Sequence, residues 1–192
     1  MKKFLYSFLS FFRQKNEIIS NEKIDKNKIK KAKKIILNLQ KDLKSYTTEG
    51  YGPFLAAIYD KEGNLIAKEA NSVVKDNCSN CHAEINTIKK AQEIFNTYDL
   101  SEYELSIYVT SEPCIMCLGA IIWSGIKEVY FGTTSNLVEK ITGFDEGFKP
   151  NWLEEFKKRD ILVYGNIESE AGKKELQDYI KENRKVYKPK RG

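Results

Sequence analysis

Four residues in two short segments have the types and the spacing of a catalytic zinc site. His82 and Glu84 are separated by one residue, and Cys114 and Cys117 follow Pro113 in a P-C-x-x-C pattern. A catalytic zinc ion typically has three protein ligands and leaves a fourth position for water. A carboxylate beside that water can carry a proton during hydrolysis. The pattern therefore predicts zinc ligation by His82, Cys114 and Cys117, with Glu84 as an unligated catalytic acid/base.

The chemistry that suits this set is hydrolysis at an electrophilic carbon. Zinc held by three protein ligands activates water near neutral pH. Glu84 can take the proton of that water and pass it to a ring nitrogen and then to a leaving amine, as hydrolytic deamination requires. Amide hydrolysis is the competing reaction. It is disfavoured because thiolates weaken the Lewis acidity of zinc and because the ligands do not follow the H-E-x-x-H pattern of zinc peptidases.

A purely structural zinc site is the main alternative, because the four cysteines form two C-x-x-C pairs, Cys78/Cys81 and Cys114/Cys117. Roughly 15–20 residues separate two such pairs in ribbon-like structural sites. Here the gap from Cys81 to Cys114 is 33 positions and reads as a helix followed by a strand. The gap favours the catalytic interpretation, in which Cys78 and Cys81 are incidental. Thiolates used as metal ligands fit a reducing, cytoplasmic compartment.

The elements around the motif must bring its two halves together. Residues 81–95 show a helical apolar stripe, residues 104–110 alternate like a half-buried strand, and Pro113 suits the start of a helix over 114–123. Residues i and i+2 do not share a helix face, so His82 and Glu84 reach one water only if their helix points its N-terminus at the site. Two helix starts at one sheet edge imply an α/β layer fold.

The remaining pattern completes a three-layer α/β/α fold with a mixed sheet of about five strands. The other expected elements are a helix over 28–43, strands over 54–59 and 65–69, a strand over 127–132, a helix over 151–159, a strand over 161–164 and a helix over 168–182. We expect one domain over 28–183. An amphipathic segment with a polar linker over 1–27 precedes it, and a basic tail over 184–192 follows it.

The motif and its surroundings resemble the cytidine deaminase superfamily over roughly residues 28–179. The run from Cys81 to Glu84 and the run from Ser111 to Trp123 suggest a branch with bacterial guanine deaminases, nucleoside deaminases and tRNA adenosine deaminases. Gly52-Pro53-Phe54 and Gly143-Phe144-Asp145 resemble guanine deaminase elements. Thr133 to Leu137 replaces the Lys-Thr-Gly-Ala-like stretch that is usual in the tRNA-acting branch.

The resemblance implies further site residues and a homodimer. Asn71 would hydrogen-bond the base or sugar, and the backbone N–H of Ala83 would hold a substrate carbonyl. Trp123 would stack on a purine, and Asp145, sometimes supplied by a partner subunit, would handle a proton of the base. From the residues alone, Asn71 fits a turn cap, Trp123 a core residue and Asp145 a surface loop carboxylate equally well.

These patterns favour zinc-dependent deamination of a free nucleobase or nucleoside, with a guanine-like purine preferred and ammonia released. A tRNA-specific adenosine deaminase is the alternative, and a zinc-stabilised interaction module belongs to a different class. The net charge of +5 divides into +8 over residues 1–50 and −3 over residues 51–192, so the body gives no general argument for nucleic-acid binding. The basic tail is a solvated end or a phosphate contact.

The first 13 residues form an amphipathic pattern. The apolar residues fall at helical spacing: Phe4, Leu5, Phe8, Leu9, Phe11 and Phe12. The run is too short to span a membrane. A signal peptide is disfavoured because Arg13 follows at once and a small-residue cleavage site is not visible. Weak contact with a membrane surface, or docking on a partner subunit, stays open.

Overall fold

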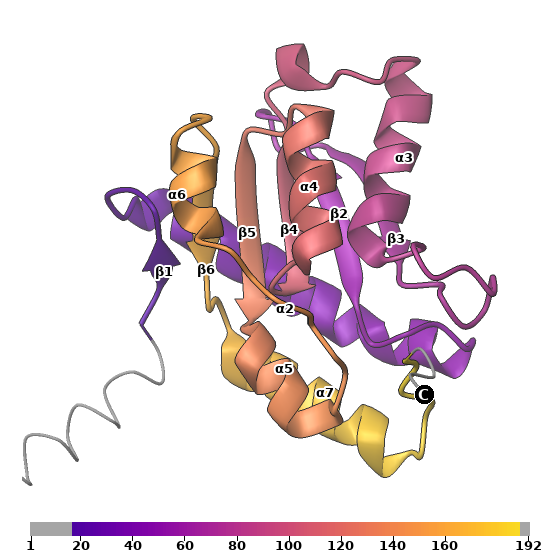
Figure 1. The fold of residues 1–192 in the computed structure, drawn as a ribbon. Helices are drawn as coiled ribbons and strands as arrows, with labels where there is room; N and C mark the ends of the chain where they lie inside the picture. The colour runs from indigo at the N-terminus through magenta and orange to yellow at the C-terminus, as the bar shows by residue number, and fades with distance from the viewer. Residues whose placement is uncertain (1–16, 189–192) are drawn as a thin grey trace, which may run out of the picture.

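The computed structural model describes residues 17–188, so the amphipathic pattern over residues 1–13 lies outside the described residues. The chain runs through an open mixed sheet with helices on both faces (Figure 1). The elements are β1 (Ile19–Ser20), α2 (Lys26–Thr48), β2 (Leu55–Tyr59), β3 (Leu65–Ala70), α3 (Ala83–Phe95), the 3₁₀ turn η2 (Ser101–Tyr103), β4 (Ser106–Ser111), α4 (Ile115–Ser124), β5 (Glu128–Thr133), α5 (Ser135–Thr142), α6 (Trp152–Lys157), β6 (Leu162–Gly165) and α7 (Ser169–Lys181). Within 17–188, none of the helices combines the length and the hydropathy needed to cross a bilayer.

The sheet confirms the expected architecture. Its strand order is β1-β6-β5-β4-β2-β3. β4, β5 and β6 run parallel, whereas β2 is antiparallel to β3 and β4. The parallel strands require crossover connections, and α4 and α6 supply them. The helix-strand alternation expected around the cysteine motif is therefore the parallel half of the sheet.

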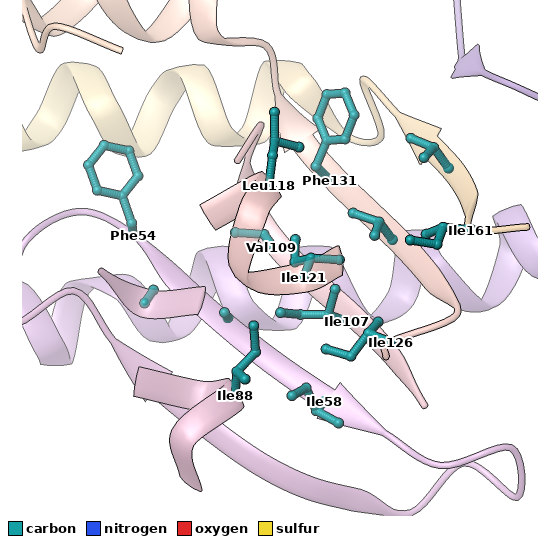
Figure 2. Packing of buried hydrophobic residues seen from close by; sticks show 14 of the residues in the cluster. Phe54, Ile58, Ile88, Ile107, Val109, Leu118, Ile121, Ile126, Phe131 and Ile161 are labelled. Carbon is teal, nitrogen blue, oxygen red and sulfur yellow. The ribbon is translucent and has the colours of Figure 1, made fainter. Parts of the chain in front are cut away.

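The core has two layers, one on each face of the sheet, and successive side chains of β4 point alternately into them. Ile107 and Val109 point to the cluster beneath α3, α4 and α6 (Figure 2), and Tyr108 points to the cluster beneath α2. Under α2 the rings of Tyr108 and Tyr130 stack with centroids 4.6 Å apart. Both faces of the sheet are thus covered, as a three-layer α/β/α fold requires.

We expected residues 16–27 to be a polar linker. The structure describes this segment from residue 17 on, and it contains the short strand β1. Ile19 pairs with Gly165 in antiparallel register. Asn21 donates to the carbonyl of Ile161 over 2.8 Å and accepts from the amide of Val163 over 2.9 Å. With β1, the sheet within residues 17–188 has six strands, where about five were expected. The two residues of β1 are too few to produce an alternating pattern, yet they cover the edge of β6.

The expected elements did not include α5, which lies between the strand expected over 127–132 and the helix expected over 151–159. The helix is only 8 residues long, so it offers barely two turns of apolar periodicity. It ends at Gly143, which has a left-handed φ of 74° that glycine adopts without a steric penalty. Gly143 is therefore a turn residue, and it starts the loop that carries Asp145.

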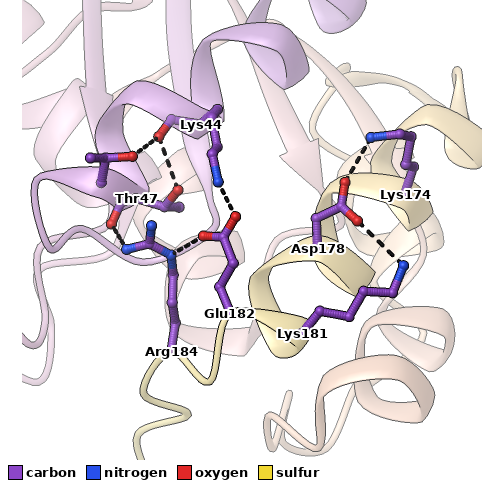
Figure 3. Close-up of polar contacts among 8 residues, drawn as sticks. Lys44, Thr47, Lys174, Asp178, Lys181, Glu182 and Arg184 are labelled. Atoms are coloured by element: carbon purple, nitrogen blue, oxygen red, sulfur yellow. Dashed lines mark hydrogen bonds and ion pairs between the residues drawn. The ribbon is translucent and has the colours of Figure 1, made fainter.

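Residues 183–188 fold back onto the domain, although the sequence suggested a separate basic tail from residue 184. Arg184 donates to the carbonyl of Thr47 and pairs with Glu182, which in turn pairs with Lys44 (Figure 3). The hydroxyl of Tyr179 donates to the carbonyl of Lys185 over 2.7 Å. These contacts carry the chain toward the site described next.

Candidate active site

The two halves of the motif meet at two helix starts. His82 is the residue before α3 and Cys114 the residue before α4, and Cys117 lies in the first turn of α4. The N-terminus of a helix carries partial positive charge, which favours the thiolate form of a nearby cysteine. The structure therefore brings His82, Cys114 and Cys117 together through the helix arrangement that the sequence required.

The spacing of the three side chains fits a zinc ion. Cys114 Sγ lies 3.6 Å from Cys117 Sγ and 3.6 Å from His82 Nδ1, and Cys117 Sγ lies 3.7 Å from His82 Nδ1. Tetrahedral zinc with ordinary bond lengths needs about 3.8 Å between two sulfurs and about 3.6 Å between sulfur and nitrogen. The group that could hold a metal comprises these three residues and not Cys78 or Cys81. The four-cysteine structural site is thus not what the fold assembles.

The electrostatics of the site also call for a cation. The pKa of Cys114 is lowered to about 4 by the hydrogen bond with Cys117, against the effect of burial and with further help from His82. The pKa of Cys117 is raised by that same hydrogen bond and by burial. Two adjacent thiolates repel each other unless a cation lies between them, and zinc supplies that charge.

Glu84 has the environment of a proton carrier. Its side chain is buried in the first turn of α3. Burial, and then the negative charge of Cys114, raise the pKa of its carboxyl above the ordinary value. A carboxyl with a raised pKa exchanges protons more readily near neutral pH than an exposed glutamate does.

These residues line a cavity of about 440 Å³. Its wall includes His82, Glu84, Cys114 and the phenylalanines Phe54 and Phe144. The two phenylalanine rings lie edge to face with centroids 5.3 Å apart. Cavities of about 300–1,000 Å³ with apolar walls and a few polar groups are typical of small-molecule sites.

Asn71 lies in this cavity, with 1 % of its surface exposed. Its Nδ2 donates to the hydroxyl of Tyr187 over 2.8 Å. A Cβ atom on Gly52 would lie 2.7 Å from Asn71 Oδ1, so the glycine allows the amide to sit there. Gly52-Pro53-Phe54 thus contributes both the space for Asn71 and the apolar wall at Phe54.

The loop after α5 brings two carboxylates to the cavity wall. Asp145 is exposed and accepts from the amide of Gly147 over 2.9 Å. Glu146 is half-buried, and burial raises the pKa of its carboxyl to about 8 despite the opposing charge of Lys149. The sequence analysis named only Asp145. Glu146 is its direct neighbour, and the sequence alone does not decide which of the two faces inward.

A buried ion pair anchors that loop next to the zinc ligands. Lys149 Nζ lies 3.0 Å from Glu112 Oε1, with side chains only 15 % and 11 % exposed. Lys149 also donates to Ser135 Oγ over 2.6 Å. Because Glu112 lies two positions before Cys114, the pair ties the loop to the segment that holds the metal ligands.

Of the two remaining expected residues, Ala83 lies beside the metal ligands and Trp123 lies outside the cavity. Ala83 is buried as the first residue of α3, beside His82. Trp123, expected to stack on a purine, is 85 % exposed and is not among the residues that line the cavity. Tyr187, which the sequence analysis did not single out, lies in the cavity wall instead, with its ring centroid 6.3 Å from that of His82. The segment around it is mostly basic, so the sequence offered no sign of a ring at the cavity wall.

A zinc ligand set beside an unligated, buried glutamate at two helix starts is the arrangement of the zinc-dependent deaminases. The family model "Cytidine and deoxycytidylate deaminase zinc-binding region" matches residues 27–133, and the chain belongs to this family. The resemblance stated from the sequence is therefore confirmed, and zinc is the cofactor of the family.

Similar proteins include enzymes that act on different substrates. The guanine deaminase of Bacillus subtilis is 39% identical over 97 residues, which cover 50% of this chain and 60% of that protein. The tRNA-specific adenosine deaminase of Rickettsia bellii is 39% identical over 85 residues, covering 44% of this chain and 57% of that protein. The chain thus aligns with somewhat over half the length of these two relatives.

Two solved structures match over a longer span. A protein crystallised with 2,6-diaminopurine has a TM-score of 0.76 and 31% identity, and the match covers 92% of both chains. The guanine deaminase of Nitrosomonas europaea has a TM-score of 0.74 and 32% identity, with 88% of this chain and 91% of that chain covered.

Proposed function

We propose that the protein is a zinc-dependent hydrolase that deaminates a free purine base or its nucleoside, preferring a guanine-like ring and releasing ammonia. The observation that carries the proposal is the cavity beside the zinc ligands, walled by Phe54 and Phe144 and bounded by Glu146 and Tyr187. These walls suit a planar ring of purine size. The guanine deaminases among the similar proteins support the same substrate class.

Each side chain of the cavity has a separate role in such a reaction. His82, Cys114 and Cys117 would hold the zinc ion, which would supply an activated water at neutral pH. Glu84 would take a proton from the attacking water, pass it to a ring nitrogen and assist the departure of ammonia. Asn71, oriented by Tyr187, hydrogen-bonds the base, and the backbone N–H of Ala83 holds a substrate carbonyl. Phe54 and Phe144 exclude water from the ring faces.

Glu146 and Asp145 make unequal contributions in this proposal. Glu146→Gln should lower kcat on the best purine by about 100-fold, within the usual range for a lost acid/base group. Asp145→Ala should lower it by at least about tenfold, the loss of a single interaction of roughly 1.4 kcal/mol. We expect the larger loss of rate for Glu146 because its side chain is half-buried, whereas Asp145 is exposed. Steady-state kinetics with zinc content as the control measures both. If both variants keep the wild-type rate, neither Glu146 nor Asp145 takes part in the mechanism.

A tRNA-specific adenosine deaminase stays the second candidate because such enzymes are among the relatives. A macromolecular substrate needs an open mouth and a basic surface around it. Residues 51–192 carry a net charge of −3, although Lys188 lies at the cavity wall. The net charge favours the small substrate.

We also propose a homodimer that pairs through α4. Met116, Gly119, Ala120 and Trp123 follow one another at helical spacing, and the two large members are 36% and 85% exposed. A Cβ atom on Gly119 would meet nothing within 4 Å, so the helix surface there is open. An apolar helix face of this kind suits burial against a second copy. Trp123 then serves the interface.

Trp123→Glu should convert the dimer to a monomer, because a buried unpaired carboxylate at an interface is costly. The matched control is Tyr98→Glu, since Tyr98 is also 85% exposed but lies outside α4. Light scattering after size exclusion measures both variants. A dimer that survives Trp123→Glu unchanged, or a wild-type monomer, would place α4 outside any subunit contact.

A reducing compartment such as the cytoplasm is part of this proposal. It rests on the use of Cys114 and Cys117 as zinc ligands, since both must stay reduced to bind the metal.

A further inference from the structure

A second and larger cavity, of about 1060 Å³, forms a groove along α5 and α7 beside the start of β1. It shares none of its lining residues with the active-site cavity. Its apolar lining comes from the start of β1, from α5 and from α7, and its members are each only partly buried: Ile18, Ile19, Leu137, Ile141 and Ile180. Partly exposed aliphatic side chains that line one groove are expected to be covered by an apolar partner.

The chain itself enters this groove. Glu17 and Ile18 belong to the lining. Asn166 Nδ2 donates to the carbonyl of Glu17 over 2.8 Å, and Ile19 is held by its pairing with Gly165. The direction of entry is therefore fixed at the point where the described residues begin.

The residues immediately before Glu17 carry the apolar pattern noted in the sequence. Phe12 is five positions from Glu17, a reach of about 17 Å even when fully extended. Such a short tether gives the segment a millimolar effective concentration at the groove, on the order expected for short linkers. A second chain or another protein has to compete with that concentration.

The length of residues 4–12 also matches the length of one wall of the groove. Residues 4–12 in helical form are about 14 Å long, close to the length of α5, whose 8 residues form one wall of the groove. The six apolar side chains of the segment lie at helical spacing, so they can face the groove together while Ser7 and Ser10 face water. We propose that residues 4–12 dock their apolar face into the groove between α5 and α7 of their own chain.

This docking has a consequence for the active site. α5 leads directly into the loop with Glu146, and α7 leads into the segment with Tyr187. The two helices already pack on each other. A segment laid across both helices would hold the two walls of the substrate cavity that follow them in a fixed relative position.

Hydrogen exchange on the full-length protein tests the proposal. Peptides covering α5 should exchange at least about tenfold faster in Phe8→Asp/Leu9→Asp than in the wild type, because local opening becomes easier when the groove is uncovered. The matched control is Ser7→Asp/Ser10→Asp, which puts the same charges on the polar face and should exchange like the wild type. Zinc content reports that each variant is folded.

A groove variant supplies the reciprocal measurement. Ile141→Lys should raise exchange over residues 4–12 themselves, since a charge in the groove expels the apolar face. The proposal is overturned if residues 4–12 exchange as an unstructured peptide in the wild type. It is also overturned if their protection appears only with phosphatidylglycerol vesicles, which indicates a membrane surface, or grows with protein concentration, which indicates a second copy.

Discussion

Glu84→Gln should lose most of the turnover of the wild type, by about 100- to 10,000-fold, while zinc binding and fold are retained. The carboxamide keeps the shape of the side chain but cannot accept a proton from water or deliver one to the ring. Glu84 is buried beside the metal ligands, so other side chains of the cavity cannot easily take over its position. Ammonia release measures the rate, and elemental analysis measures the zinc.

The control for this variant is the metal content together with the melting temperature. A glutamine variant with full zinc and a near wild-type rate would show that another group moves the proton. Loss of zinc along with activity would instead make Glu84 a ligand, contrary to the three-residue group that the structure assembles.

Cys114→Ser should abolish both zinc binding and activity. Cys114 lies within 3.6 Å of each of the other two ligand atoms, so its removal leaves two ligands where three are needed. We expect turnover to fall by more than about 1,000-fold, because the activated water is lost along with the metal. Chelation of the wild-type metal should have the same effect, and added Zn²⁺ should restore the rate.

Cys78→Ser is the matched control, because Cys78 belongs to the other C-x-x-C pair of the chain. Its thiol donates to Asn80 over 2.8 Å and is not part of the metal group. This variant should keep its zinc and its rate. If it loses zinc instead, the two cysteine pairs share one metal and the site is structural.

The metal site and the layers were predictable because each depends on local pattern. Metal ligands need fixed spacing, and helices and strands of ten or so residues show their period in the apolar residues. The expected helix over 114–123 and the observed α4 differ by one residue at each end. The alternation of helices and strands around the cysteine motif followed from the same periods.

The parts of the site that were missed depend on contacts between distant segments. Tyr187 meets Asn71 across 116 positions of sequence, and this hydrogen bond has no local signature. Glu146 and Asp145 are neighbours of equal charge, and only the path of the loop, which the Lys149–Glu112 pair ties to the metal-ligand segment, shows which of them is half-buried. Trp123 lies outside the cavity wall and is exposed, and a sequence does not show whether a single aromatic residue of a helix faces a cavity or solvent. The short elements β1 and α5 offered too few residues for a period to appear.

The most direct test of the account is ammonia release from a panel of guanine, guanosine, adenine, adenosine, cytosine, cytidine and tRNA, with the wild type and Glu84→Gln side by side. We expect guanine or its nucleoside to have the highest kcat/KM, by at least about tenfold over cytosine or cytidine, a difference of roughly 1.4 kcal/mol in transition-state binding. The glutamine variant should remove that activity. A clear preference for cytosine or cytidine, or release from tRNA alone, would contradict the assignment of the cavity to a free purine.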